Sequence, residues 1–184
     1  ETLDASIRKA ADFLLKEQNR DGSWGNHTRT KGLNVLCPYP EGPRSFRTAS
    51  TSLCVIGLLT SPLKEDPAVK ASLDKALQYL LTTLPTLKRG DTRTVLGVWG
   101  HAYGLSALSR AARNLPADAP LREELKKVAS LQVKALDQMA DVQGGWGYYT
   151  FETFSKRPIG EPTSFLTATV LLAYKDAEQA LGLK

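Results

Sequence analysis

Hydrophobic residues recur with helical spacing in six stretches of the chain, and these stretches alternate between two kinds. Three are amphipathic, with one apolar stripe and one charged face: residues 3–18, 67–84 and 119–140. The other three are apolar or small nearly all round: residues 46–60, 92–113 and 163–181. A helix without a polar face must be covered on every side. The alternation therefore predicts three helical hairpins, with the second kind forming an inner layer and the amphipathic helices lying around it.

The rest of the sequence favours a single all-α domain. No segment has a convincing strand alternation, and 184 residues suit one domain with a sizeable core. Asp66 followed by Pro67 is typical of a helix start, with a capping side chain and a proline in the first turn. The chain divides into three repeats of one hairpin each, at about 1–62, 63–115 and 116–184.

Two of the three repeats share a motif where the outer helix ends: a glutamine, a short gap and Gly-x-Trp-Gly. Its members are Gln18, Gly22 and Trp24 in the first repeat, and Gln138, Gly144 and Trp146 in the third. The two tryptophans are 122 residues apart, so the middle repeat should carry the motif near residues 85–91, where it is lost. Glycines permit a tight exit from a helix, and a Trp ring can cover the helix end. We expect a structural clasp in preference to a ligand-binding tryptophan.

This motif resembles the QW repeats of squalene and hopene cyclases, which belong to the terpenoid cyclase/prenyltransferase superfamily of α/α toroids. The stretches VWGHAYGLSAL (98–108) and GGWGYYTF (144–151) are most similar to small bacterial proteins of the prenyltransferase/squalene-oxidase repeat type. The resemblance covers most of the chain. It implies an α/α toroid with inner and outer helices, and it says little about activity because the repeat is architectural throughout the superfamily.

Complete toroids use about six hairpins, so three hairpins imply half a toroid in two layers. Its inner helices either pack together or present an open concave face that a protein partner or a second copy of the chain would close. Small residues are expected to allow close packing of the inner helices: Gly57, Gly97, Gly100, Gly104 and Ala168.

The catalytic motifs of the superfamily are missing. The chain has no DxDD or DCTAE-like acid motif, no thioester motif and no Asp-x-Cys zinc pattern. His27, Cys37, Cys54 and His101 match no zinc spacing. We therefore predict no catalytic residue, no metal site and no cofactor. Whether Cys37 and Cys54 form a disulfide stays open.

The three longer connections are expected at one end of the domain, together with most of the net charge of +5 and many aromatic residues. Basic groups, aromatic rings and helix N-termini suit an anionic or protein partner. The alternative is that the aromatic residues only pin the loops to the helix ends. Candidate binding residues are Arg44, Arg47, Trp99, His101, Tyr103, Tyr148, Tyr149, Lys156 and Arg157. His101 has a second interpretation, as a buried histidine hydrogen-bonded within the core.

Two functions remain open. One is a non-catalytic binding or assembly module that uses the loop end or the concave face; the other is an enzyme or subunit that binds an isoprenoid in an apolar cavity. Nucleic acid is an unlikely partner, because the basic residues are scattered and no known motif is present. No apolar run approaches the roughly 20 residues that span a bilayer. The start at Glu1 is compatible with an exported mature chain and with a trimmed form.

Overall fold

The computed structural model describes residues 2–26, 41–90, 92–152 and 154–183. Within these ranges the chain forms six α-helices and one 3-10 turn. They are α1 (Leu3–Glu17), α2 (Glu41–Thr60), α3 (Pro67–Thr83), η1 (Leu84–Thr86), α4 (Gly97–Arg113), α5 (Pro120–Met139) and α6 (Ser164–Leu181). The predicted all-α fold is confirmed. Over the described part of the chain, no helix has the length and apolarity that a bilayer crossing requires.

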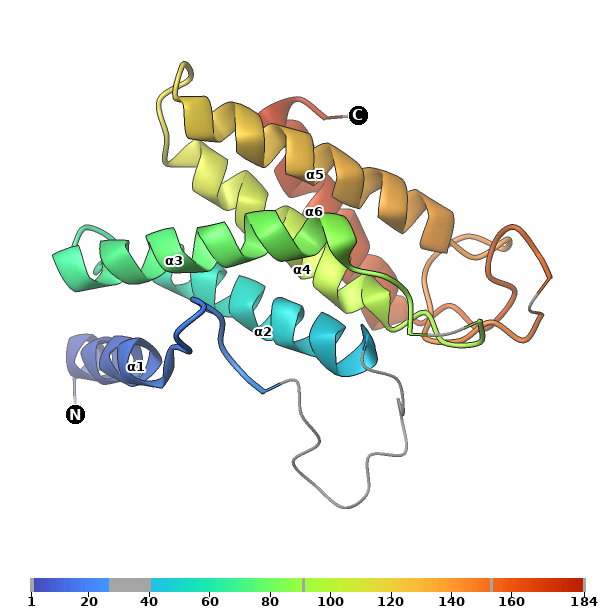
Figure 1. Ribbon diagram of the computed structural model, residues 1–184, viewed down its shortest axis with the longest axis horizontal. Helices are drawn as coiled ribbons and strands as arrows, with labels where there is room; N and C mark the ends of the chain where they lie inside the picture. Colours follow the sequence, from blue (N-terminus) through green and yellow to red (C-terminus); the bar gives the residue numbers. More distant parts are fainter. Residues whose placement is uncertain (1, 27–40, 91, 153, 184) are drawn as a thin grey trace.

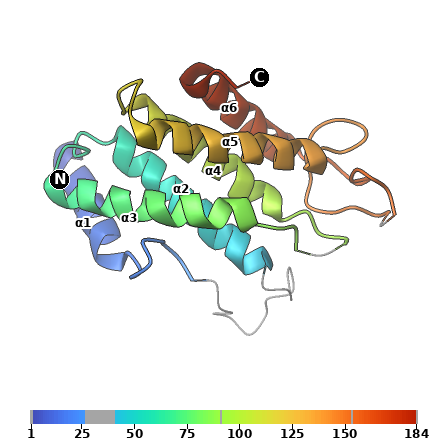
Figure 2. The same cartoon turned by 45° about the horizontal axis from the view of Figure 1, so that its top comes forward.

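Figure 1 shows α4 in the middle of the molecule, between α2 and α6. The amphipathic helices α3 and α5 lie over this layer, and α1 lies at its side and contacts α3. Figure 2, turned by 45°, shows the same order of helices. All three helices of the α2–α4–α6 layer begin at one end of the molecule, where the longer connections arrive (Figure 1).

The central helix α4 is buried along most of its length, as the absence of a polar face predicted. Two of its glycines let neighbouring elements approach the backbone closely. A side chain at Gly100 would meet Leu87 and Ser45, and one at Gly104 would meet Leu84. Leu84 belongs to η1 and Leu87 follows it, so α4 is packed tightly against the connection that leads into it from α3.

The outer members of the inner layer, α2 and α6, are not covered on all sides, and the prediction of complete burial was wrong for them. Each has only one inner neighbour, α4, and keeps an exposed apolar face. Leu171 and Leu172 on α6 are 56% and 65% exposed. Two small residues expected in helix contacts, Gly57 and Ala168, lie on these exposed faces.

The helix boundaries differ from the prediction at two starts. The helix α2 begins at Glu41, five residues before the predicted start, and α4 begins at Gly97, five residues after it. The delay in α4 has a physical cause: residues 93–95 are extended and pair with residues 148–150. The Val95 amide donates to the Tyr148 carbonyl at 2.6 Å, and the Thr150 amide donates to the Arg93 carbonyl at 2.9 Å.

The C-terminal ends of α4 and α6 are tied together by ion pairs of Arg110 and Arg113 with Asp176, and also by one side chain of α5. Arg122, near the start of α5, donates hydrogen bonds to the carbonyl oxygens of Ala112 on α4 and Ala180 on α6. Both carbonyls belong to last turns, where carbonyl oxygens carry partial negative charge, and the Ala112 carbonyl also accepts from the Leu115 amide at 3.3 Å. The guanidinium satisfies both at once, so it fixes three helices relative to one another.

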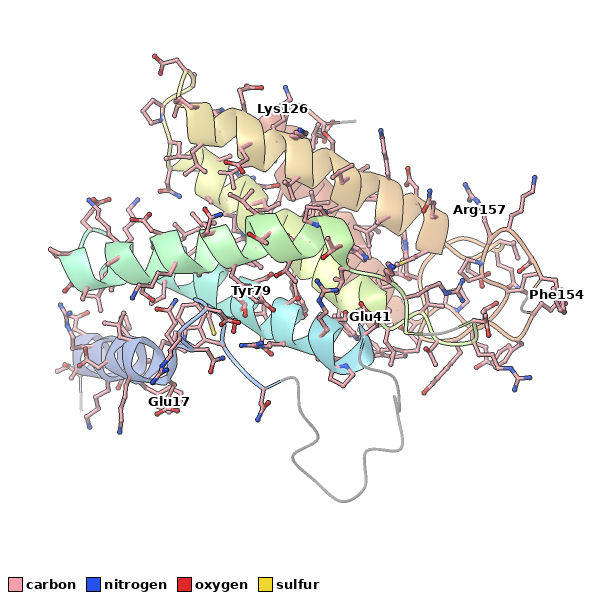
Figure 3. All side chains as sticks on the ribbon, viewed as in Figure 1. Glu17, Glu41, Tyr79, Lys126, Phe154 and Arg157 are labelled. Carbon is pink, nitrogen blue, oxygen red and sulfur yellow. The ribbon has the colours of Figure 1, made fainter. Side chains whose placement is uncertain are left out.

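Replacing Arg122 by methionine should lower the free energy of unfolding by about 2–3 kcal/mol, because two part-buried carbonyls lose a charged donor. Urea denaturation measures this change. The matched control is Lys126→Met one turn later, where the side chain lies on the exposed outer side of α5 (Figure 3) and the cost should stay within about 0.5 kcal/mol. Equal costs for the two variants would contradict the role assigned to Arg122.

Candidate functional site

The first Gly-x-Trp motif closes the C-terminal end of α1 onto α2. The Trp24 indole Nε1 donates to the Leu14 carbonyl of α1 at 2.7 Å. The Trp24 amide donates to Thr51 Oγ1 of α2 at 2.9 Å. Gly22 makes the turn in the left-handed region, with φ of 87°, and its amide donates to the Asn19 carbonyl. The ring is buried, so the motif acts as a clasp between an outer helix and an inner one.

The second motif repeats these contacts 122 positions later. Trp146 Nε1 donates to the Leu136 carbonyl at 2.8 Å, and the Trp146 amide donates to Thr167 Oγ1 at 3.1 Å. Gly144 has φ of 91°, and its amide donates to the Asp141 carbonyl. The two clasps therefore share these three hydrogen bonds. The shared bonds align α1 with α5, and α2 with α6, residue by residue.

The glutamines of the two motifs are not equivalent. Gln18 Nε2 donates to the carbonyls of Gly22 and Ser72, and Gln18 Oε1 accepts from Ser72 Oγ, so this amide joins α1 to α3. In the register set by the tryptophans, Ala140 occupies the position of Gln18 in the third repeat. Gln138 lies two residues earlier, exposed on α5, and the expected match between the two glutamines was wrong.

The middle repeat replaces the clasp with leucines. Its α3 continues into the 3-10 turn η1, where Leu84 and the following Leu87 are buried against α4. The loss of the Gly-x-Trp sequence near residues 85–91 therefore coincides with a different way of closing the helix end.

Four candidate binding residues meet in one cluster at the start of α4 and α6. Trp99 stacks on Tyr103 at a centroid distance of 5.4 Å and on Phe165 at 5.8 Å, and it lies 6.2 Å from Tyr148. Tyr149 follows at 6.3 Å from Tyr148. We call these five residues the aromatic cluster. Its most accessible member, Phe165, is 53% exposed, and sequence reasoning missed it although an aromatic residue at the start of an inner helix was a usable signal.

The aromatic cluster lies on the inner side of α4, away from α3 and α5. Trp99 and Tyr103 belong to the row of α4 that is least buried, and the bridge between residues 93–95 and 148–150 holds Tyr148 and Tyr149 beside it. Its rings combine a flat apolar surface with hydroxyl groups at the edge, an arrangement suited to binding rather than to proton transfer.

His101 does not belong to this cluster, and it lies in the core as its second interpretation expected. It is 2% exposed, and its Nδ1 lies 2.6 Å from Gln132 Oε1 on α5. Its Nε2 is buried without a hydrogen-bond partner among the described residues. Burial lowers the pKa of His101, and the hydrogen bond to Gln132 opposes this only in part. Gln132 was also missed; a polar residue within the apolar stripe of α5 was the available signal.

The basic candidates are spread over three places. Arg44 pairs with Glu41 at 3.5 Å, and Arg47 pairs with Asp21 at 2.9 Å while its guanidinium lies over the Tyr79 ring. Arg44 also donates to Thr86 of η1, so both arginines hold α2 to its neighbours, and their predicted role in binding stays a prediction. Lys156 and Arg157 are exposed in the connection between α5 and α6, where Figure 3 shows Arg157 and Phe154 apart from each other.

Partial burial raises the pKa of Asp21, but hydrogen bonds from Ser23 and the charge of Arg47 outweigh it, and the net shift is downward. The pKa values of Glu65 and Asp66 are also lowered, through contacts with Lys70 and Arg8. A general acid needs the opposite shift. In the described ranges, no three His, Cys, Asp or Glu residues gather as a metal site would require.

Cys54 is a free thiol in the described structure, and burial raises its pKa to about 11. A high pKa keeps the thiol protonated and unreactive at neutral pH. His27 and Cys37 lie outside the described residues, so a disulfide between Cys37 and Cys54 stays an open prediction.

Open grooves lie at the two ends of the helix layer, and a further hollow of about 590 Å³ lies between α1 and α2 beside Leu14, Trp24 and Cys54. The groove between α5 and α6 has a volume of about 770 Å³ and is lined by residues that include Val133, Asp137, Leu171 and Tyr174. The groove between α1 and α2 has a volume of about 340 Å³ and is lined mainly by apolar and small residues, among them Ile7, Ala10 and Gly57.

No protein-family model matches the chain, and no solved structure matches it. The geometry of the aromatic cluster and of the two grooves therefore carries the functional argument.

The two clasp glycines provide a matched pair of substitutions. Gly144→Ala should cost about 1–2 kcal/mol of stability, because alanine is strained at positive φ and the added methyl meets open space. Gly22→Ala should cost more, about 3 kcal/mol or above, because the methyl also collides with the Lys75 carbonyl of α3. Urea unfolding of both variants checks the order, and a cheaper Gly22→Ala would contradict the tight contact between this clasp and α3.

Stability should depend on pH through His101. Its pKa is lowered in the folded state, so the unfolded chain binds the proton more readily below about pH 6.5. Stability is complete above that pH and is lost as the pH falls toward the folded-state pKa. Urea unfolding of the wild type between pH 7.5 and 5.5 should show this loss, and His101→Gln should show a smaller one. His27 is present in both proteins and cancels; equal losses would contradict the assignment.

Proposed function

We propose that the chain is a non-catalytic binding or assembly module with a fold like that of the terpenoid cyclases, and that it recognises a protein partner through the inner face of its helix layer. The observation that carries the proposal is the aromatic cluster, which ends in the 53% exposed Phe165 and continues into the exposed leucines of α6. Aromatic anchors surrounded by apolar surface are typical of protein interfaces. The Gly-x-Trp clasps support the family resemblance as architecture.

Protein is a better candidate than an anionic polymer. The two arginines nearest the helix layer, Arg44 and Arg47, already have acidic partners within the chain. The exposed Lys156 and Arg157 lie in the α5–α6 connection, several residues beyond Tyr148 and Tyr149. A surface for a polyanion would need a larger group of cations around its rings.

The alternative function is isoprenoid binding, as a cyclase-like or prenyltransferase-like enzyme or subunit. The apolar rings around Trp99 are the observation in its favour. Against it, the grooves of about 770 and 340 Å³ are open to solvent, and the shifted pKa values of Asp21, Glu65 and Asp66 are all lowered, not raised as a general acid requires.

Capture from a lysate of the source organism tests the proposal when three immobilised proteins are compared. The wild type should retain a stoichiometric partner, and Phe165→Ser should lose it with at least about tenfold weaker binding, as expected for an aromatic anchor. Phe154→Ser is the matched control, because Phe154 is fully exposed at the tip of the α5–α6 connection (Figure 3). A wild type that retains no partner, or a partner lost equally with both variants, would contradict the proposal.

Titration with farnesol distinguishes a binding module from an isoprenoid-binding protein. Trp24 and Trp146 are buried in the clasps, so Trp99 is the half-exposed tryptophan whose fluorescence would respond to an apolar ligand. A binding module should show no saturable change on titration. A saturable change in the wild type that is lost in Trp99→Phe would favour isoprenoid binding instead.

A further inference from the structure

We propose that the chain also associates with a second copy of itself, and that the α5–α6 edge of one copy receives the α1–α2 edge of the other. This goes beyond the binding role proposed for the aromatic cluster, because the contact uses the two edges of the helix layer. The matching contacts of the two clasps align the repeats, and the alignment shows what covers the equivalent of each exposed face elsewhere in the chain.

The exposed face of α6 repeats the face with which α2 packs on α4. Because Thr51 and Thr167 make the same bond to the clasp tryptophan, α2 and α6 align with a shift of 116 positions. The buried residues Ala49, Ser52 and Val55 of α2 then correspond to Phe165, Ala168 and Leu171 of α6. The first set faces inward and the second set is exposed. The exposed face of α6 is thus built to receive a further inner helix.

The free face of α2 repeats, in turn, the face that α6 turns toward α4. The buried residues Leu166, Val170 and Ala173 of α6 correspond to Ser50, Cys54 and Gly57 of α2. Ser50 and Gly57 are exposed, and a side chain at Gly57 would meet open space. A glycine in mid-helix costs about 1 kcal/mol relative to alanine. Nothing in the described packing of one copy compensates that cost, whereas a closely packed neighbouring helix would.

The outer helices show the same difference between the two ends. A shift of 122 positions aligns α1 with α5. The residues Leu125, Ala129, Gln132 and Leu136 of α5 are fully buried. Their counterparts on α1 are Leu3, Ile7, Ala10 and Leu14, which are exposed or only partly covered. The α1–α2 edge therefore exposes, at least in part, the helix face that is buried in the core at the α5–α6 end.

These two edges are complementary because the chain already contains the contact between them. In both the α2–α4 and the α4–α6 contact, an inner helix packs the face that looks toward the next repeat against the face of the next inner helix that looks back toward it. Placing α2 of a second copy beside α6 continues the same interface, and its α1 then enters the groove of about 770 Å³ beside α5, as α3 lies beside α1 within one chain. Such a head-to-tail contact joins two different patches.

Sedimentation equilibrium of the full chain tests the contact. The wild type should show concentration-dependent association above its monomer mass of 20.1 kDa. Leu171→Asp blocks the α6 edge and Gly57→Lys blocks the α2 edge, and each should weaken association at least about tenfold. Gly57→Lys should remain folded, because lysine favours the helix and enters open space.

Mixing the two blocked variants gives the decisive measurement. Each is defective alone, but together they retain one intact pair of edges and should form a one-to-one dimer and nothing larger. Leu131→Asp, on the part of α5 outside the groove, is the matched control and should associate normally. A monomeric wild type, a mixture that stays monomeric, or equal loss with Leu131→Asp would overturn the inference.

The outcomes also separate this inference from the proposed function. A monomeric wild type that still captures a partner through Phe165 overturns self-association and leaves the binding role in place. Association through the two edges, without any captured partner that depends on Phe165, supports self-association and removes the aromatic cluster as a binding surface.

Discussion

The structure depends on the need to bury α4. This helix has no polar face, and a helix of that kind is stable in water only when neighbours cover it on all sides. Its neighbours meet the requirement: α2 and α6 lie beside it, α5 covers it, and η1 with the following Leu87 packs on its glycines. Glycines at positions 100 and 104 remove the side chains that would hold the preceding hairpin away. The order of the layers follows from this single constraint.

Polar contacts then fix the relative position and rotation of the helices, which burial alone does not determine. Apolar packing is non-directional, so helices that only share a core can slide or rotate. The clasps at Trp24 and Trp146 fix each outer helix to its inner partner, and Arg122 fixes the opposite ends of α4 and α6. The pairing of residues 93–95 with 148–150 joins two connections that are far apart in sequence. Direction and register therefore come from a small number of hydrogen bonds.

Helical periodicity was enough to predict the fold class, all six helix ends and four of the six helix starts to within one residue, and the burial of α4, because these depend on local sequence. It was not enough for Gln138, whose position relative to Gln18 is set by the three-dimensional register, or for Arg44 and Arg47, whose acidic partners follow from how the helices meet. Burial of α2 and α6 was overestimated because composition does not show how many neighbours a helix at the end of a layer has. Trp99, Tyr103 and Tyr148 come together as a cluster, and only the fold adds Phe165.

The distribution of the clasps has a consequence for how the molecule opens. Both Gly-x-Trp clasps lie in hairpins at the ends of the layer, and the middle hairpin closes its helix end with leucines packed on α4. An end hairpin has a neighbour on one side only, so it needs a bond of its own to stay docked, whereas the middle hairpin is retained by neighbours on both sides. The free energy of local opening should therefore fall from α4 toward α1 and α6, and the two tryptophans mark the places where the chain would come apart first.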